Sequence, residues 1–271
     1  MNGASRGALA AARERLDALT DSTSVDAGSL ADELAAVTAL LHREVSLRRV
    51  LTDPAQPGEA KAELAQRLLG TQVGGQTVDL MSGLVRSRWS QSRDLVDALE
   101  QLAALADLTA AQRAGTLDNV EDELFRFGRI VSSSTELRAA LTDRKAPASA
   151  KGELLRSLLG SRTAATTERL VTRLVTAPRG RSLEAGLESL SKLAAERRDR
   201  MVAVVTSAVP LSDPQKQRLG AALAKLYGRR MHLNLDVDPG VLGGIRVQVG
   251  DEVINGSIAD RIEDVGRRMA S

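Results

Sequence analysis

The stretch LRRVLTDPAQPGEAKAELAQRLLG, Leu47–Gly70, returns 90 residues later without a gap as LRAALTDRKAPASAKGELLRSLLG, Leu137–Gly160. Thirteen of the 24 paired positions are identical, which indicates an internal duplication and not a chance match. A period of 90 residues is longer than the roughly 20 to 50 residues of solenoid repeats. Two tandem helical bundles therefore fit this sequence better than a superhelix.

Each copy has the pattern of an antiparallel helical bundle. In the first copy, apolar side chains between Leu30 and Leu41 recur at the spacing of one helix face, and Ser29 with Asp32 predicts the N-terminal cap of that helix. Gly70 is predicted to end a later helix in the left-handed conformation. Further helices are expected at about 77–87 and 92–106, and in the second copy at about 117–132, 135–141, 147–159, 163–177 and 182–200.

The hydrophobic period changes after residue 200. Alternating and β-branched segments are typical of strands, and a short helix lies between two of them. This helix begins at a capping box of Ser212 and Gln215, and Leu219, Leu223 and Leu226 are expected on its inner face. Strands are expected at about 201–209, 232–237, 245–249 and 252–255, the helix at 212–227, and a last helix from 257.

These patterns predict a mostly α fold with a small α/β module at the carboxyl end. The expected architecture is tandem antiparallel helical bundles followed by a three- to four-stranded sheet with two helices. The predicted domains are 1–107 for the first bundle, 108–200 for the second and 201–271 for the module. Their formal charges are −4, +5 and +1, which indicates that the three segments face different partners.

The composition excludes several classes of site. The sequence has no Cys, so it forms no disulfide, and with only His42 and His232 it offers no Cys/His zinc site. No catalytic residue, cofactor site or metal site is predicted. The amino end lacks the pattern of a signal peptide. The longest apolar-rich run, near 201–212, is shorter than the roughly 20 residues of a spanning helix, so membrane attachment is expected through a partner and without direct insertion.

Three local motifs have competing interpretations. Gly70–Thr77 is rich in glycine like a phosphate loop, but it lacks the Gly-Lys-Ser/Thr element, so a linker that ends a helix is favoured. Val241–Gly244 has one glycine pair of the kind found in a KH clamp, and a turn is favoured there. The arginine pairs at 197–198, 229–230 and 267–268 leave a nucleic-acid-binding α/β module as the alternative function, although such pairs more often lie on solvated faces.

The few aromatic and histidine side chains also have two interpretations each. His42 and His232 have no serine or cysteine partner at a spacing typical of catalysis, so a surface or edge-strand position is favoured. Trp89, Phe125 and Phe127 are expected in the core or between helices, with the anchoring of a partner as the alternative.

Residues of the carboxyl-terminal module carry a family resemblance. MHLNLDVDPGVLGGIRVQVG, Met231–Gly250, resembles the signature of the delta subunit of bacterial F-type ATP synthases, the oligomycin-sensitivity-conferring protein family. VINGS, Val253–Ser257, is similar to its closing Ile-Asp-Gly-Ser, with Asn255 in place of the aspartate. VTSAVPLSDPQ, Val205–Gln215, is similar to the segment that opens the family's small module. The signature residues, to which a structural role is assigned, are Asp238, Pro239, Gly243, Gly244, Gly250, Asp251, Gly256 and Ser257.

The resemblance implies a non-catalytic stator, or peripheral-stalk, subunit present in one copy per complex. In the family, the helical domain binds the amino-terminal helix of an alpha subunit, and the small module holds the end of the membrane-anchored b subunit. The implied location is peripheral, at the cytoplasmic face of the plasma membrane, with no nucleic acid as partner.

The resemblance covers about residues 108–271 directly and reaches the first bundle only through the repeat. The first bundle therefore corresponds to a diverged duplicate of the kind found in actinobacterial relatives. We expect the second bundle, and not the first, to contact the alpha-subunit helix. We expect the first bundle to lie along the b-type stalk, because its net charge of −4 suits a more basic partner.

Overall fold

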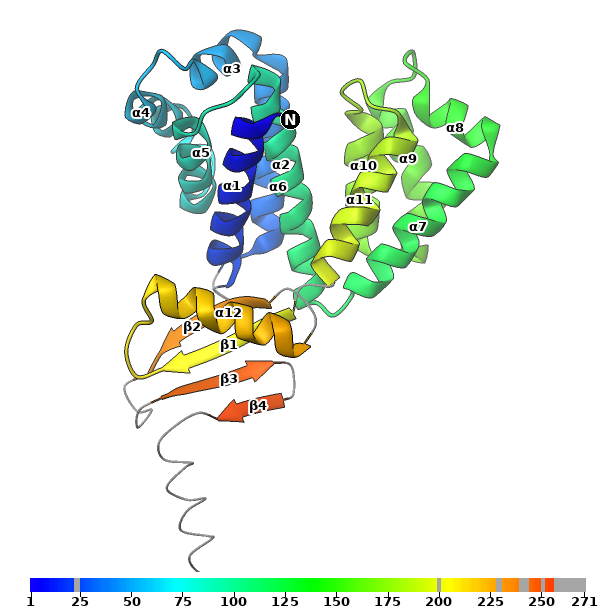
Figure 1. Ribbon diagram of the computed structural model, residues 1–271. Coiled ribbons are helices and arrows are strands. Elements are labelled where there is room, and N and C mark those ends of the chain that lie inside the picture. Colours follow the sequence, from blue (N-terminus) through cyan, green and yellow to red (C-terminus); the bar gives the residue numbers. More distant parts are fainter. Residues whose placement is uncertain (22–24, 199–200, 228–230, 239–243, 250–251, 256–271) are drawn as a thin grey trace, which may run out of the picture. The chain divides into compact units, whose positions relative to one another are not determined.

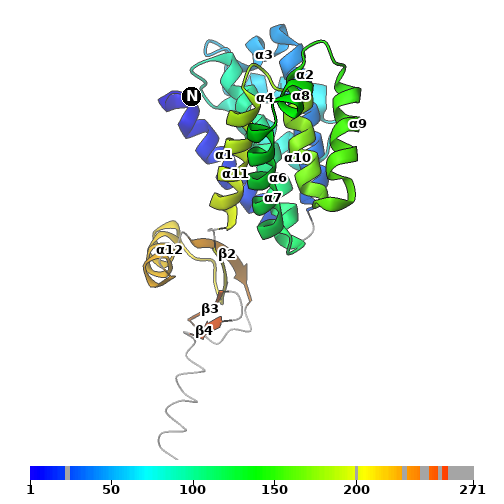
Figure 2. The same cartoon turned by 90° about the vertical axis from the view of Figure 1, so that its right-hand side faces the viewer.

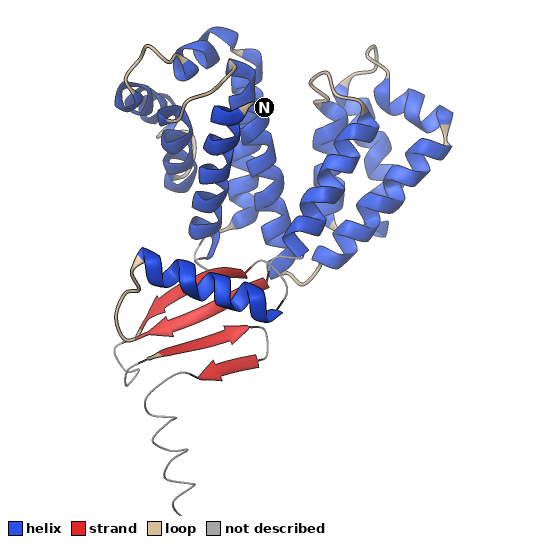
Figure 3. Cartoon of the chain, in the orientation of Figure 1, coloured by secondary structure: helices blue, strands red, loops and turns tan. Residues whose placement is uncertain are grey.

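The structure is a computed structural model that describes residues 1–21, 25–198, 201–227, 231–238, 244–249 and 252–255. It divides into two compact units, Met1–Arg197 and Arg198–Ser271. The first unit is helical and the second combines a sheet with a helix, as the coloured cartoon of Figure 3 shows. The predicted fold class, mostly α with a small α/β module, is confirmed.

The helical unit contains two successive sets of helices (Figure 1). The first set is α1 (Gly3–Asp21), α2 (Ala27–Arg43), α3 (Val45–Thr52), α4 (Gly58–Leu69), α5 (Gly75–Arg86) and α6 (Ser92–Arg113). The second set is α7 (Leu117–Ser133), α8 (Thr135–Thr142), α9 (Ala148–Leu159), a 3-10 turn (Gly160–Arg162), α10 (Ala165–Thr176) and α11 (Leu183–Arg198).

Helix α1 was not among the predicted helices, although the repeat contains it. Adding the period of 90 to Gly3–Asp21 gives residues 93–111, which lie within α6. Three equivalent pairs are identical at this offset: Ala8 with Ala98, Leu9 with Leu99, and Asp17 with Asp107. α6 is therefore both the last helix of the first copy and the counterpart of α1 in the second.

Two separate apolar cores show how α6 serves both copies. Its residues from Leu95 to Ala106, apart from Ala104, contribute to the first core, which α1 to α5 complete. Its carboxyl-terminal part contributes Ala104, Leu108 and Ala111 to the second core, which α7 to α11 complete. The predicted boundary between residues 107 and 108 falls inside this one continuous helix, and the division into three domains stays a prediction.

The amino-terminal cap of α2 differs from the prediction. Ser29 lies inside the helix, and the cap is Asp26, whose Oδ1 accepts hydrogen bonds from the Gly28 N–H at 2.9 Å and the Ser29 N–H at 3.3 Å. The Ser29 hydroxyl and these N–H groups hold the pKa of the Asp26 carboxyl below its usual value. Asp26 takes the role because its carboxylate stands nearer the helix start and suits the positive end of the helix dipole.

Gly70 ends α4, as predicted, but not in the left-handed conformation. Its φ of −61° and ψ of −20° are right-handed, and its N–H donates to the Gln66 carbonyl at 2.8 Å. A Cβ at this position would lie 2.6 Å from the same carbonyl oxygen. The close approach of that carbonyl, and not a positive φ, therefore explains the glycine.

An identical hydrogen-bonded clasp starts the fifth helix of each copy. Neither α5 nor α10 has a side-chain cap of its own. In the first copy, Glu33 of α2 accepts from the Gly74 N–H at 3.0 Å and from the Thr77 hydroxyl at 2.5 Å. In the second, offset by 90 at every position, Glu123 of α7 accepts from the Ala164 N–H at 3.0 Å and from the Thr167 hydroxyl at 2.5 Å. The clasp places a carboxylate at a helix N-terminus, where the macrodipole stabilises it.

The second unit is a four-stranded mixed sheet with α12 on one face (Figures 2 and 3). Its elements are β1 (Met201–Ser207), α12 (Asp213–Tyr227), β2 (Met231–Val237), β3 (Ile245–Val249) and β4 (Glu252–Asn255). The strand order is β2-β1-β3-β4, with β1 parallel to β2 and the other two pairs antiparallel. The predicted strands are thus confirmed, and the helix expected from Ser257 lies outside the described residues.

The inner face of α12 is partly as predicted. The Ser212 N–H and hydroxyl each lie 2.8 Å from Gln215 Oε1, so the capping box is confirmed. Leu223 is buried and Leu219 packs against the same core. Leu226 is 67% exposed, and Tyr227 packs against the core instead, because 219, 223 and 227 are each four residues apart and share one face.

Candidate functional site

Most of the predicted signature residues lie outside the described part of the chain. These are Pro239, Gly243, Gly250, Asp251, Gly256 and Ser257. Of the two that are described, Asp238 follows β2 and its N–H donates to the Ser207 carbonyl at 3.0 Å. Gly244 has a φ of +83°, a left-handed conformation that favours glycine. Both are backbone features of turns, and the structural role assigned to the whole signature stays a prediction.

One hollow in the helical unit is a cleft between the two sets of helices. It encloses about 620 Å³ and is bounded by α2 and α6 on one side and by α10, the loop after it and α11 on the other. The two walls differ in side-chain size, because the first is rich in alanine and the second in leucine. The alanines are Ala35, Ala39, Ala103 and Ala104, and the leucines are Leu170, Leu174, Leu190 and Leu193.

One end of the cleft carries an ionic cluster built on Asp107 of α6. Its side chain is fully buried and pairs with Arg169 at 2.8 Å and with Arg173, both of α10. Arg173 also pairs with Asp32 of α2 at 2.5 Å, so the cluster joins the two copies. Burial raises the pKa of Asp107 to about 6, against the opposing effect of the two guanidinium groups.

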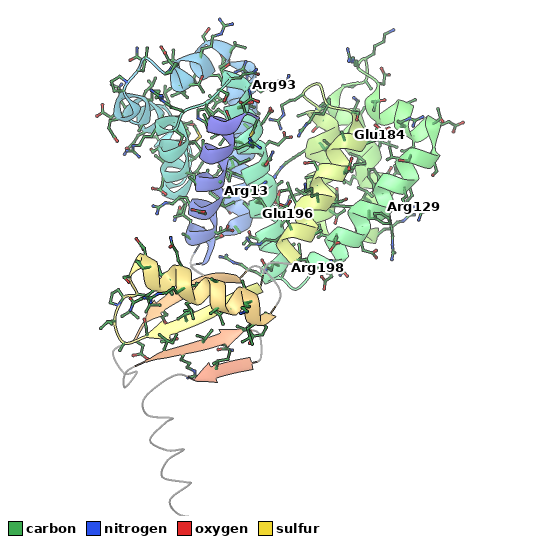
Figure 4. The ribbon with its side chains drawn as sticks, viewed as in Figure 1. Arg13, Arg93, Arg129, Glu184, Glu196 and Arg198 are labelled. Carbon is green, nitrogen blue, oxygen red and sulfur yellow. The ribbon has the colours of Figure 1, made fainter. Side chains whose placement is uncertain are left out.

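A second ionic cluster holds the loop between α10 and α11 against α6. Glu100 of α6 accepts from Arg179, whose Nη2 lies 2.5 Å from its Oε1, and from Arg181. Arg93, labelled in Figure 4 near the start of α6, donates to the carbonyl of Arg179. All three contacts run from the second copy to the amino-terminal half of α6, which belongs to the first core.

A buried ion pair joins α1 to the end of α11. Arg197 donates from Nη1 to Asp17 Oδ1 at 2.6 Å and from Nε to Gln112 Oε1 at 2.6 Å. Its side chain is 8% exposed and that of Asp17 is 5% exposed. The expectation that the arginine pair at 197–198 lies on a solvated face is therefore wrong for Arg197. Asp17 and Asp107 are identical residues at the repeat offset of 90, and this identity is the one feature of the sequence that marks both buried acids.

A smaller groove of about 510 Å³ lies between α7 and α11 of the second copy. Phe125 lines it and is 58% exposed, so the expectation of a core position is wrong for this residue. Phe127 is buried, and Trp89 is buried with its Nε1 donating to the Leu84 carbonyl at 2.8 Å, so both agree with the core prediction. Arg129 and Glu184, both labelled in Figure 4, stand on its two sides.

The other candidate residues described by the structure form no phosphate-binding or metal-binding site. The Gly70–Thr77 segment has its Gly74 N–H and Thr77 hydroxyl bound to Glu33, which agrees with a linker and not a phosphate loop. His42 is exposed on the last turn of α2 and lines the cleft. Within the described residues, no three His, Asp or Glu side chains gather into a possible metal site. Of the described helices, none is both long and apolar enough to cross a membrane.

Comparisons with known proteins decide the family. Residues 103–269 match the model of the family described as ATP synthase delta (OSCP) subunit, which is more than half of the chain. This chain belongs to that family. The match begins inside α6, at the residues where this helix passes into the second core.

Full-length relatives also cover the first copy. A protein named "ATP synthase subunit delta" from Streptomyces coelicolor is 87% identical over 271 residues, 100% of this chain and 99% of its own length. One of the same name from Thermobifida fusca is 49% identical over 270 residues and covers 100% of both chains. The extra amino-terminal bundle is therefore shared with these actinobacterial relatives, and the resemblance found in the sequence is confirmed.

One chain of a solved structure, the "Cryo-EM structure of Toxoplasma gondii mitochondrial ATP synthase hexamer", is similar over 62% of this chain and 95% of its own. Its identity is 20% and its TM-score 0.28, too distant a likeness to bear on the fold. Family membership makes this chain a non-catalytic subunit of an ATP synthase. Of the arginine pairs on which the nucleic-acid-binding alternative rested, those at 229–230 and 267–268 lie outside the described residues, and Arg197 of the remaining pair is bound to Asp17.

Proposed function

We propose that this chain is the peripheral-stalk subunit that links the catalytic head of an F-type ATP synthase to its membrane-anchored b subunit. By holding both, it stops the head from turning with the rotor, so that proton-driven torque reaches the nucleotide sites. It acts without catalysis of its own, in one copy per complex, at the cytoplasmic face of the membrane. Such a link needs a stiff body and sites that accept helices firmly.

The observation that carries the proposal is the apolar cleft beside α6 and α10. An amphipathic helix binds by placing its apolar side chains in a hydrophobic groove. Leu190 of α11 is half-buried and supplies apolar surface, next to leucines of α10 and α11 that belong to the second core. Ala35 and Ala39 of α2 are at least partly exposed and allow a close approach of the partner's backbone. We assign this cleft to the amino-terminal helix of an alpha subunit. α2 of the first bundle forms part of one wall. The proposed contact therefore involves both bundles, whereas the sequence alone predicted contact with the second bundle only.

The ionic contacts around the cleft support the stiffness that the role requires. Asp17 with Arg197, Asp32 with Arg173, and Glu100 with Arg179 each join an element of the first copy to one of the second. In the Asp17–Arg197 pair both side chains are buried. Removing one partner of a buried pair is costly, because the other charge is then left buried without a partner. The two copies therefore resist opening as one body under load.

The second unit is assigned to the end of the b subunit. Its core has four buried apolar residues, and several large apolar side chains remain exposed. The exposed residues are Val209, Leu226, Val237 and Val253. The first bundle, with its net charge of −4, is assigned to the b-type stalk.

Filling the cleft tests the function directly. Ala39 is exposed on the cleft wall of α2, so Ala39→Trp blocks the space without disturbing the core. Membranes that carry this variant are expected to hydrolyse ATP with less proton pumping per ATP, because the head is held less firmly. Ala36→Trp is the matched control, since Ala36 is exposed on the same helix and does not line the cleft. Fully coupled hydrolysis in the Ala39→Trp membranes would refute docking in the cleft.

A further inference from the structure

The loop between α10 and α11 holds Arg179 in an unusual state. Its φ of +48° is in the left-handed region, the only such value for a non-glycine residue among those described. Left-handed backbone is strained for a residue with a Cβ, and such strain gathers at functional sites. The side chain is only 9% exposed, and it lines the cleft.

The hydrogen-bonding capacity of Arg179 is only partly used. Nη2 contacts Glu100, while Nε and Nη1 are buried and have no hydrogen-bond partner. Burial lowers the pKa of this guanidinium, with Glu100 acting in the opposite direction. Buried donors without partners are costly, so the site is incomplete as it stands.

The charges around the cleft leave an excess of one positive charge at this place. Arg179 and Arg181 share the single carboxylate of Glu100. Asp97, the other acid that acts on Arg179, lies 3.9 Å from Arg93 and pairs with it. At the Asp107 cluster, two acids meet two arginines, so no excess arises there: Asp32, Asp107, Arg169 and Arg173.

The equivalent loop of the first copy shows that the fold does not require an arginine. Trp89 and Arg179 are each the third residue after the preceding helix, α5 or α10, and the helices that follow are equivalent at an offset of 88, as Leu95 is to Leu183. Trp89 is buried and has its one donor satisfied by the Leu84 carbonyl. In the first copy the loop is closed onto the core. In the second, the loop places an arginine with two buried, unpaired nitrogen atoms among the residues that line the apolar cleft.

We infer that the cleft selects its helix by an acidic side chain, whose carboxylate is received by Arg179 and Arg181. The inference rests on the proposed function, because the helix is the one assigned to the cleft. A carboxylate supplies the missing acceptors for Nε and Nη1 and neutralises the excess charge. The apolar walls favour an amphipathic helix over a small free anion, since only the helix fills the rest of the cleft.

The test measures binding of a labelled peptide to the full chain. The probe is the first roughly 25 residues of the alpha subunit from the same synthase, long enough for a helix that spans a small domain. In a set of peptides, each acidic residue is replaced in turn by its amide. One of these replacements is expected to weaken binding by roughly 30-fold, and Arg179→Gln is expected to weaken binding of the unmodified peptide by a similar factor. Arg179→Gln with the weakened peptide is expected to lose nothing further, because both changes remove the same pair.

Two further variants keep the test decisive. Arg181→Gln removes one of the two positive charges that share Glu100 and leaves Arg179 unchanged. It is expected to weaken binding of the unmodified peptide as well, because the excess positive charge is lost. Arg129→Gln alters an exposed arginine of the α7–α11 groove and is expected to change nothing. Thermal unfolding of each variant verifies that it is folded.

The outcomes separate the two proposals. If the unmodified peptide does not bind the wild-type chain, docking in the cleft fails and the inference fails with it. If the peptide binds but no amide replacement and neither Arg179→Gln nor Arg181→Gln changes its affinity, docking stands and the acidic selection is overturned. Inorganic phosphate that binds through Arg179 while the amide peptides keep full affinity would make this a small-anion site and also overturn the inference.

Discussion

The two copies of the helical repeat are alike at their clasps and different at the loop that follows. Glu33 and Glu123 lie 90 residues apart, and each accepts hydrogen bonds from an equivalent backbone N–H and an equivalent threonine hydroxyl at the same distances. The loop after the fifth helix carries Trp89 in one copy and Arg179 in the other. The duplicated bundles thus share the contacts of the clasp and differ in the contacts of the loop residue.

This difference separates residues that make the fold from a residue that makes a site. Trp89 is buried with its donor satisfied, so it serves the stability of the first bundle. Arg179 is buried with two donor atoms unsatisfied, which does not help the second bundle to fold.

The largest expected effect comes from exchanging these two residues for alanine. Trp89→Ala is expected to lower the free energy of unfolding by about 3–5 kcal/mol, because a large buried ring is lost from a packed core. Arg179→Ala is expected to change it by less than about 1 kcal/mol, because Arg181 still pairs with Glu100 and unsatisfied donors are removed. Urea unfolding followed by circular dichroism measures both. Equal losses in the two variants would mean that Arg179 is a structural residue like Trp89.

A second contrast concerns Asp17 of α1 and Asp107 of α6, which occupy equivalent positions of the repeat. The pKa of Asp107 in the folded chain is raised to about 6 from its ordinary 3.8. Between these two values the folded chain holds the proton more tightly than the unfolded chain, so this group's contribution to stability falls as the pH rises from about 4 to about 6. The free energy of unfolding of the wild type, minus that of Asp107→Asn, is therefore expected to fall by about 2.4 kcal/mol between pH 4 and pH 7.

Taking the difference removes the titration of all other carboxyl groups, which both proteins share. Urea unfolding at a series of pH values gives the two curves. A difference that stays constant from pH 4 to pH 7, or that grows with pH, would show that Arg169 and Arg173 outweigh burial and keep Asp107 ionised.

The sequence predicted the helices well because their signal is local. Apolar spacing at residues 30–41 and the duplicated stretch at 47–70 identify helices without reference to anything distant. α1 was not predicted, although the repeat contains it. Its counterpart in the second copy lies within α6, which had been assigned to the end of the first copy. The cap of α2 went to Asp26 and not Ser29 because several residues near a helix start can cap it, and only the backbone geometry decides.

The cleft could not be predicted, because its walls are made of alanines and leucines that look like core residues in the sequence. Whether Leu174 or Leu190 faces a core or a cleft depends on how the two copies pack against each other. The burial of Arg197 has the same cause, since its partner Asp17 lies 180 residues away. Arginine pairs are usually solvated, and this general expectation fails where a long-range partner exists.

The smallest expected effect tests the feature that the copies share. Glu33→Gln and Glu123→Gln keep the size of the side chain and remove the charge that accepts from Gly74 or Ala164 and the nearby threonine. Each is expected to lower the free energy of unfolding by about 2 kcal/mol, the usual contribution of hydrogen bonds to a charged acceptor. Because the distances are the same in both copies, the two losses are expected to agree within about 0.5 kcal/mol, and together to add.

Thermal and urea unfolding of the two single variants and the double variant provide the measurement. Glu136→Gln is the control, because Glu136 is an exposed acid near the start of α8 and accepts none of the clasp hydrogen bonds. A loss at Glu123 well above that at Glu33 would mean that the second copy depends on its clasp more. A double variant that loses much less than the sum would show that the shared helix α6 couples the two bundles energetically, since Glu33 and Glu123 have no contact with each other's clasp.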